Sequence, residues 1–178
     1  MVWSPTKWGV AHYVLLTRVK LRSWGIGNGI CPHSDCKCAE SLVHVFWDCY
    51  RVRPVLIWVE DLIRDIFYMN FTLDRNFFIF GGPAPPAPRL SVHRLWFILC
   101  TAKFHIWKAR SDKVFESRSM TDAVLLSVIK QYIRTRLYAD FNRLSRKQFE
   151  NSWLVGSSFV SLPGDPLILS SHMLAVIC

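Results

Sequence analysis

Cysteine and histidine residues cluster in one short segment, and this cluster constrains the fold more than any other feature of the chain. In the run CPHSDCKCAESLVHVFWDC, two close pairs of soft metal ligands are separated by seven residues. Zinc prefers four such ligands in a tetrahedron, and proteins often supply them as two pairs. The first pair spans turn-forming residues, and the second pair lies about one and a half helical turns apart. The spacing predicts one closed, structural zinc site formed by Cys31, Cys36, His44 and Cys49.

Two neighbouring residues leave this ligand set open. Cys38 can replace Cys36, and His33 can serve as a ligand in a rearranged site. A group of reduced, partly buried cysteines without a metal is a further interpretation. A catalytic cysteine with His44 as its base is weaker, because no residue suggests itself as an oxyanion donor or as a partner that orients the histidine.

The sequence places these cysteines in a reducing compartment. The first ten residues mix Trp, Pro and Lys and lack the continuous apolar stretch of an export signal. The most apolar segment, residues 95–107, is interrupted by Lys103 and His105 and is too short and too polar to span a bilayer. We therefore expect a protein of the nucleus or cytoplasm that does not bind membranes. Cysteines stay reduced there, which favours a metal site over disulfide bonds.

Hydrophobic periodicity predicts a mainly α-helical protein. Helices are expected over residues 11–23 and from Pro54 to residue 69. Residues 91–115 repeat apolar positions at four-three-four-three spacing, which indicates a long helix with one buried stripe. A second long helix is expected from Thr121, a favourable N-cap, to Glu150. Its predicted apolar stripe is Leu125, Ile129, Tyr132, Ile133, Leu137, Phe141 and Leu144.

Between and after these helices, other structure is expected. The stretch NFFIFGG, residues 76–82, is predicted to be a short strand or an extended link. The predicted organisation has five segments: an N-terminal helix with the zinc knuckle (11–53), a linker helix with a short extended segment (54–80), a Pro/Gly loop (81–90), a long helical pair (91–150) and a poorly ordered tail (151–178).

Positive charge lies on two flanks of the cysteine-rich segment. The net charge is +9; residues 1–30 hold four basic and no acidic residues, and residues 94–150 hold twelve basic and five acidic ones. Residues 31–90 are nearly neutral. Basic flanks of this kind are typical of polyanion binding, and a solvated helix face is the alternative. The predicted phosphate contacts are the basic residues of the two long helices: Lys103, Lys108, Arg110, Lys113, Lys130, Arg134, Arg143 and Lys147.

Aromatic residues are unusually frequent, with eight tryptophans and twelve phenylalanines in 178 residues. Exposed aromatic rings can stack on bases, although we expect Trp96 and Trp107 to pack in the core. The surplus also predicts apolar surface that a partner, or another part of a larger protein, covers.

One family combines these features. The run LLTRVKLRSWGIGNGICPHSDCKCAESLVHVFWDC resembles the zinc-binding segment downstream of the polymerase in reverse transcriptases of LINE-type (non-LTR) retrotransposons. The shared features are a helix, a Trp-Gly turn, a Cys-Pro start, a Glu-Ser pair before the histidine and the HVFWDC end. The family's two cysteines, histidine and cysteine fall on the four ligands predicted above. The stretch LWFILCTAKFHIWKAR also looks like the long helix that follows this knuckle, so the resemblance covers roughly residues 11–150.

The resemblance implies a module that helps to hold template RNA and target DNA. The chain has no Tyr-x-Asp-Asp motif and no acidic cluster that would hold two magnesium ions, since Asp61 and Asp65 are expected on an exposed helix face. We therefore expect a truncated or domesticated remnant that is not an enzyme and that binds RNA in preference to DNA, with a reverse transcriptase core as a candidate partner. The alternatives are a protein-interaction remnant that docks a polymerase domain, and an open reading frame without selected function.

Overall fold

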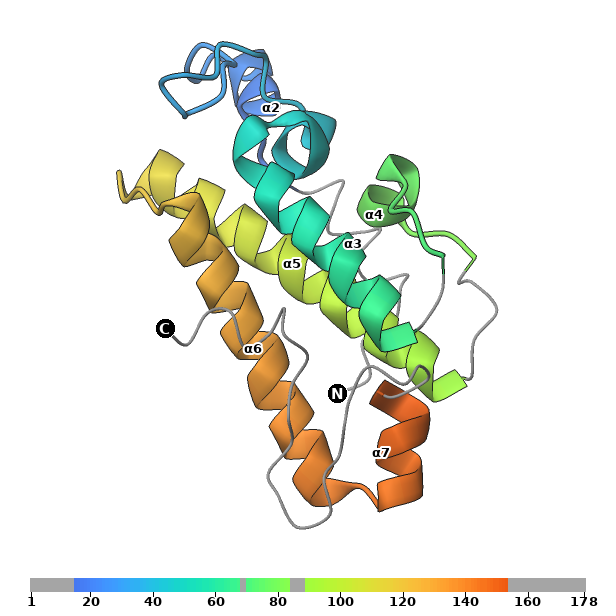
Figure 1. Ribbon diagram of the computed structural model, residues 1–178. Coiled ribbons are helices and arrows are strands. Elements are labelled where there is room, and N and C mark those ends of the chain that lie inside the picture. The colour runs from blue at the N-terminus through green and yellow to red at the C-terminus, as the bar shows by residue number, and fades with distance from the viewer. Residues whose placement is uncertain (1–14, 68–69, 84–88, 154–178) are drawn as a thin grey trace.

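The computed structural model describes residues 15–67, 70–83 and 89–153, and within these ranges the chain is mainly α-helical, as predicted (Figure 1). The β pairing within these ranges is one isolated antiparallel bridge between Ile30 and Ala39. The elements in chain order are α2 (Arg18–Ser23), a π-helical turn η1 (His44–Asp48), a 3₁₀ turn η2 (Tyr50–Val52), α3 (Arg53–Phe67), α4 (Arg75–Phe80), α5 (Arg89–Phe115), α6 (Asp122–Arg143) and α7 (Arg146–Trp153).

Helices α3, α5 and α6 contact one another and enclose one hydrophobic core, which extends from Cys31 to Trp153. The predicted stripe of α5 is buried at Leu95, Leu99, Ala102 and Ile106 and half-buried at Ala109. Trp96 and Trp107 pack against this core, as predicted. The cysteine-rich segment lies where α5 ends and α6 begins, and α7 lies at the other end of the molecule (Figure 1).

The predicted N-cap of α6 is confirmed: the Thr121 hydroxyl accepts a hydrogen bond from the Val124 backbone amide at 3.3 Å. Four residues of the predicted stripe are buried: Leu125, Ile129, Ile133 and Leu137. Tyr132 and Phe141 belong to the same predicted stripe, but their side chains are 55% and 45% exposed. The buried stripe of α6 is therefore narrower than predicted.

The predicted single helix from Thr121 to Glu150 is wrong: α6 ends at Arg143, Leu144 caps it, and a separate helix, α7, begins at Arg146. The Ser145 hydroxyl accepts a hydrogen bond from the Gln148 amide at 3.4 Å, and Gln148 Oε1 accepts one from the Ser145 amide at 3.1 Å. This reciprocal pair is a capping box, which starts a new helix. Helix α7 then turns back so that Phe149 and Trp153 are buried. The predicted start of the tail at residue 151 is too early, and residues 154–178 lie outside the described residues.

Two smaller elements also differ from the prediction. NFFIFGG contributes to a helix, α4, because the Asp74 carboxylate accepts a hydrogen bond from the Phe77 amide at 2.9 Å and caps it. Helix α2 begins after Thr17, so residues 15–17 are not helical, and residues 11–14 lie outside the described residues. Of the predicted loop 81–90, residues 81–83 are non-helical, residues 84–88 are not described and α5 already begins at Arg89.

Among the described helices, none is both long enough and apolar enough to cross a bilayer.

A buried carboxylate fixes α7 against the long helices. Asp140 accepts from Arg94 Nη2 at 2.8 Å, from Arg136 Nε at 3.1 Å and from the indole Nε1 of Trp153 at 3.1 Å. The Asp140 side chain is only 6% exposed, and the Arg94 guanidinium also lies over the Trp153 ring. Because burial penalises an unpaired charge, Asp140 holds α5, α6 and α7 together only as long as its partners are present.

This arrangement predicts that Asp140→Asn lowers the free energy of unfolding by about 3 kcal/mol, because the half-buried Arg94 loses its counter-charge. Asp112→Asn is the matched control: it removes an acid that pairs with the exposed Lys108 on α5, and should cost less than about 1 kcal/mol. Urea unfolding followed by circular dichroism measures both. Equal losses would contradict the role of Asp140.

Candidate metal centre

The first ligand pair lies in a loop that closes on itself. The Cys31 amide donates to the Cys38 carbonyl oxygen at 2.9 Å, and the neighbouring Ile30–Ala39 bridge holds the two ends of the loop together. Within the loop, the Cys36 amide donates to the His33 carbonyl oxygen at 2.9 Å. This turn brings Cys31 and Cys36 to one side of the loop.

The second pair is brought together by the π-helical turn η1. In an α-helix, residues five apart point in different directions, because 3.6 residues complete one turn. Here the Cys49 amide donates to the His44 carbonyl oxygen at 3.0 Å, which closes a wider, five-residue turn. Single π-helical turns occur frequently at functional sites. The wider turn places His44 and Cys49 on the same side, facing the first pair.

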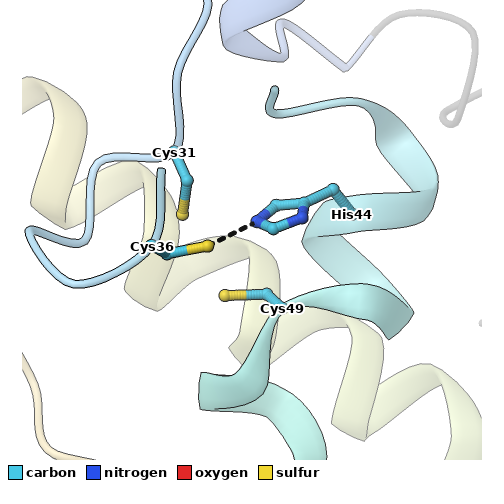
Figure 2. A group of neighbouring side chains, drawn as sticks. All are labelled: Cys31, Cys36, His44 and Cys49. Atoms are coloured by element: carbon cyan, nitrogen blue, oxygen red, sulfur yellow. Dashed lines mark hydrogen bonds between the residues drawn. The ribbon is translucent and has the colours of Figure 1, made fainter. Parts of the chain in front are cut away.

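All four predicted ligands converge, and we call them the Cys₃His group: Cys31, Cys36, His44 and Cys49 (Figure 2). Their ligand atoms lie within 4.8 Å of one another, and all four residues are buried. Cys36 Sγ lies 3.4 Å from His44 Nε2. A tetrahedral ion with metal–sulfur bonds of about 2.3 Å and metal–nitrogen bonds of about 2.0 Å holds its ligand atoms roughly 3.5 to 3.8 Å apart. The Cys₃His group can therefore hold a metal ion after small side-chain shifts.

Protonation in this group follows from burial and from contacts between the sulfur atoms. The pKa of Cys31 is raised by its hydrogen bond to Cys49 and by burial, whereas that hydrogen bond lowers the pKa of Cys49. Burial raises the pKa of Cys36 and lowers the pKa of His44. At neutral pH the imidazole is therefore neutral, as a metal ligand must be, while Cys31 and Cys36 keep their protons until a metal displaces them.

The alternative ligands lie outside this group. Cys38 is exposed: its backbone carbonyl accepts from the Cys31 amide, and its thiol interacts with that of Cys36 but is not among the converging ligand atoms. His33 is half-buried and lines the same small cavity as the Cys₃His group, and burial lowers its pKa. Cys100 lies on α5 and is not among the converging residues.

A buried ion pair, which the sequence did not predict, anchors the metal-binding segment to α5. Glu40 Oε1 accepts from Arg110 Nε at 3.0 Å and also from Arg110 Nη2. It accepts in addition from the Arg18 backbone amide at 2.8 Å. The side chains of Glu40 and Arg110 are 1% and 5% exposed. Glu40 precedes His44 by four residues and lies just before the helical turn, so this contact positions the ligand segment, but no local sequence signal marks Glu40 as buried.

Cations surround a small cavity of about 40 Å³ beside the Cys₃His group. Arg51, Arg110 and Lys113 line it together with His33. Arg51 also forms an ion pair with Asp122 at 2.9 Å and donates to the Met120 carbonyl oxygen at 2.7 Å. Glu40 and Asp122 also line the cavity and pair with Arg110 and Arg51, so Lys113 is the cation in excess there. Three thiolates and a divalent ion carry a net negative charge, which Lys113 would partly offset in a metal-loaded group.

Two of the predicted phosphate contacts, Lys103 and Arg110, are wrong, because their side chains are buried. Arg110 is committed to Glu40, and its guanidinium lies over the Trp107 ring at 4.7 Å from the centroid. Lys103 is 2% exposed, lies over the Phe78 ring, and has its pKa lowered by burial. Neither side chain reaches the surface, so neither can contact a polyanion in this structure.

The other six predicted contacts do not form one patch. Lys108 pairs with Asp112, and Lys113 lies beside the metal-binding group. Lys130 and Arg134 share one side of α6, where their side chains are half-buried against the Trp58 and Tyr138 rings. Arg143 lies about half a turn away from Arg134 around α6. Lys147 follows on α7, and both Arg143 and Lys147 are exposed.

The fold and the site define a small helical protein with a buried Cys₃His group that can hold a metal ion. No protein-family model matches the chain, and no solved structure matches it. The chain is 25% identical over 172 residues to the transposon TX1 uncharacterized 149 kDa protein of Xenopus laevis. The match covers 93% of this chain but only 12% of that protein, so the chain spans a small part of its relative's length. The chain is therefore similar to part of a transposon-encoded protein.

The convergence predicts which substitutions remove the metal. Cys31→Ser, Cys49→Ser and His44→Ala should each abolish stoichiometric binding, because each removes one of four ligands. The controls are Cys100→Ser and Cys38→Ser, which remove thiols outside the group and should leave the metal content unchanged. Native mass spectrometry measures the content directly. Full metal occupancy in Cys49→Ser would contradict the ligand set.

The pKa shifts predict that metal binding releases protons. Cys31 and Cys36, with raised pKa values, must each lose a proton, Cys49 loses less, and His44 is already neutral at pH 7. About two to three protons should leave per metal ion, so the apparent affinity should rise roughly 100-fold or more per pH unit around neutrality. Calorimetry in buffers of different ionisation enthalpy counts these protons. A release near zero would mean that the thiols are already ionised.

Proposed function

We propose that this chain is a non-catalytic nucleic-acid-binding module, held by one structural zinc ion and derived from a retrotransposon reverse transcriptase. The observation that carries the proposal is the convergence of four buried ligands, in a basic chain that aligns over most of its length with a transposon-encoded protein. RNA is the preferred ligand in this proposal. The nucleus or cytoplasm is its expected location.

The choice of zinc rests on the chemistry of the ligand set. Three thiolates and one imidazole in a tetrahedral arrangement suit zinc better than magnesium or calcium, which prefer oxygen ligands. Four protein ligands leave no open coordination position, which is the usual difference between a structural and a catalytic zinc. The bound ion would join the loop to the π-helical turn, and so would stabilise a loop whose buried core members are its two cysteines.

The choice of nucleic acid rests on charge. Some exposed cations of the described chain have no acidic partner. Arg143 and Lys147 are exposed, and neither forms an ion pair with another described residue. Lys130 and Arg134 have aromatic rings as neighbours and no acidic partner among the described residues. Such cations are available to phosphates, and the release of counterions would drive binding. An apolar protein partner would not require this excess of charge.

The test compares two sets of four substitutions that remove the same charge. Changing Lys130, Arg134, Arg143 and Lys147 to Gln should weaken binding to single-stranded RNA more than tenfold at low salt. The dependence of log affinity on log salt should become shallower by about 0.7 for each lost contact. The matched set changes four cations that already pair with acids on their own helix or in a surface turn: Arg64, Lys108, Arg118 and Arg146. These pairs leave less charge available to phosphates, so the loss should be smaller. Gel-shift titrations at several salt concentrations measure both.

Equal losses in both sets would mean that net charge alone attracts RNA and would contradict these contacts. Absence of salt-dependent RNA binding by the unchanged protein would contradict the proposed function. Binding of an apolar partner that does not weaken with salt would then favour the protein-interaction alternative.

A further inference from the structure

The loop that follows α2 presents apolar side chains to solvent. We call residues 24–29, the sequence WGIGNG, the Trp24 loop. Trp24 is 58% exposed and Ile26 is 56% exposed, which makes them two of the most exposed large apolar residues of the described chain. The loop and α2 extend from one end of the molecule, away from the three long helices (Figure 1). Neither side chain contributes to the hydrophobic core.

The Trp24 loop is held in a defined conformation by hydrogen bonds. The Ile26 amide donates to the Leu21 carbonyl oxygen at 3.0 Å. Arg18 Nη2 donates to Asn28 Oδ1 at 3.1 Å, which fastens the far side of the loop to α2. Gly29 has a φ of 79°, and a Cβ atom there would lie 2.8 Å from Arg22 Cδ, so the Arg22 side chain can cross the loop only because this residue is glycine. The two apolar side chains are therefore displayed by a preorganised turn.

The surroundings of the exposed indole are positively charged. Lys20 Nζ lies over the Trp24 ring at 5.7 Å from its centroid, and Arg22 is exposed. Between residues 15 and 34 the chain has no acidic residue, although Glu40 contacts the backbone at Arg18. An exposed indole among cations, without competing carboxylates, suits a ligand that carries both flat apolar rings and regularly spaced negative charges.

We propose that the Trp24 loop is a second nucleic-acid contact, in which an unpaired base stacks on the Trp24 indole while Arg22 and Lys20 contact the neighbouring phosphates. This inference rests on the proposed function and adds a site on α2 and the loop that follows it, apart from the cations of α6. Single-stranded nucleic acid is the favoured occupant, because its unstacked bases offer ring faces, which in a duplex are hidden. Duplex DNA or RNA would use the cations but not the indole.

The decisive variants separate stacking from charge. Trp24→Ala should weaken binding to single-stranded oligouridylate between about 5-fold and 150-fold, the range for removal of a base-stacking aromatic side chain, and should leave the salt slope unchanged. Trp24→Phe should restore most of the affinity. Arg22→Gln should instead reduce the salt slope by about 0.7. Phe80→Ala is the matched control, because Phe80 is 54% exposed on α4, away from the loop.

Each variant is tested as the full chain loaded with metal, with its metal content and thermal midpoint compared with the unchanged protein. A direct readout is available from ¹⁹F NMR of protein labelled with 5-fluorotryptophan. The Trp24 resonance is assigned by its loss in Trp24→Phe and should shift when oligouridylate is added. Heparin, a polyanion without bases, should bind Trp24→Ala as well as it binds the unchanged protein.

Three outcomes would overturn the inference. Equal RNA affinity of Trp24→Ala and Phe80→Ala would contradict the stacking contact and would leave the proposed function intact. An equal loss of heparin binding in Trp24→Ala would show that the indole acts without bases. Binding to vesicles of phosphatidylserine and phosphatidylcholine that depends on Trp24, with unchanged RNA affinity, would assign the loop to an anionic membrane surface. Failure of the unchanged protein to bind any RNA would contradict the proposed function itself.

Discussion

The Glu40 carboxylate joins three segments that are far apart in the sequence. It accepts hydrogen bonds from the Arg110 guanidinium on α5 and from the Arg18 backbone amide at the start of α2. The backbone amide of Glu40 also donates to the Gly29 carbonyl oxygen at 2.9 Å. A charge this deeply buried is tolerated only when it is paired, and loss of one partner of such a pair typically costs about 3–5 kcal/mol. The position of the metal-binding segment on the long helices therefore depends on this buried ion pair, together with the Arg51–Asp122 ion pair and the burial of Phe46 in the core.

The metal-binding group depends on backbone geometry that this anchor supports. Two ligands come from a loop closed by one β bridge, and two come from a π-helical turn that brings residues five apart onto the same side. The π-helical turn packs Val45, Phe46 and Trp47 into or against the core, whereas the loop contributes only its two cysteines to it. The ion pair on one side and a bound metal on the other would therefore add most to the stability of the loop.

The sequence was informative where local rules decide the structure. Soft ligands in two pairs, apolar residues at helical spacing and a threonine N-cap act through neighbouring residues, and the Cys₃His group, α5 and the start of α6 agree with them. Helix α4 and the end of α6 differ from the prediction because their bounds are set by caps, Asp74 and the Ser145–Gln148 pair, which the apolar pattern alone does not indicate. The burial of Lys103 and Arg110 could not be predicted from neighbouring residues in the sequence. Both lie on the same helix as exposed cations, and only packing against Phe78 and Glu40 distinguishes them.

The two ends of the helical core are fastened by different chemistry. Thiols and an imidazole gather at the end where α5 meets α6, whereas the far end, where α7 turns back, is closed by the Asp140 carboxylate, two guanidinium groups and an indole. Local opening in proteins usually involves contiguous units with their own free energy, and these two ends have the features of separate units. Chelators and oxidants would loosen the first end while leaving the second closed, and loss of the Asp140 carboxylate by substitution would release α7 while leaving the first end closed. The helical core is thus closed at its two ends by two separate groups of contacts, and each group responds to a different chemical change.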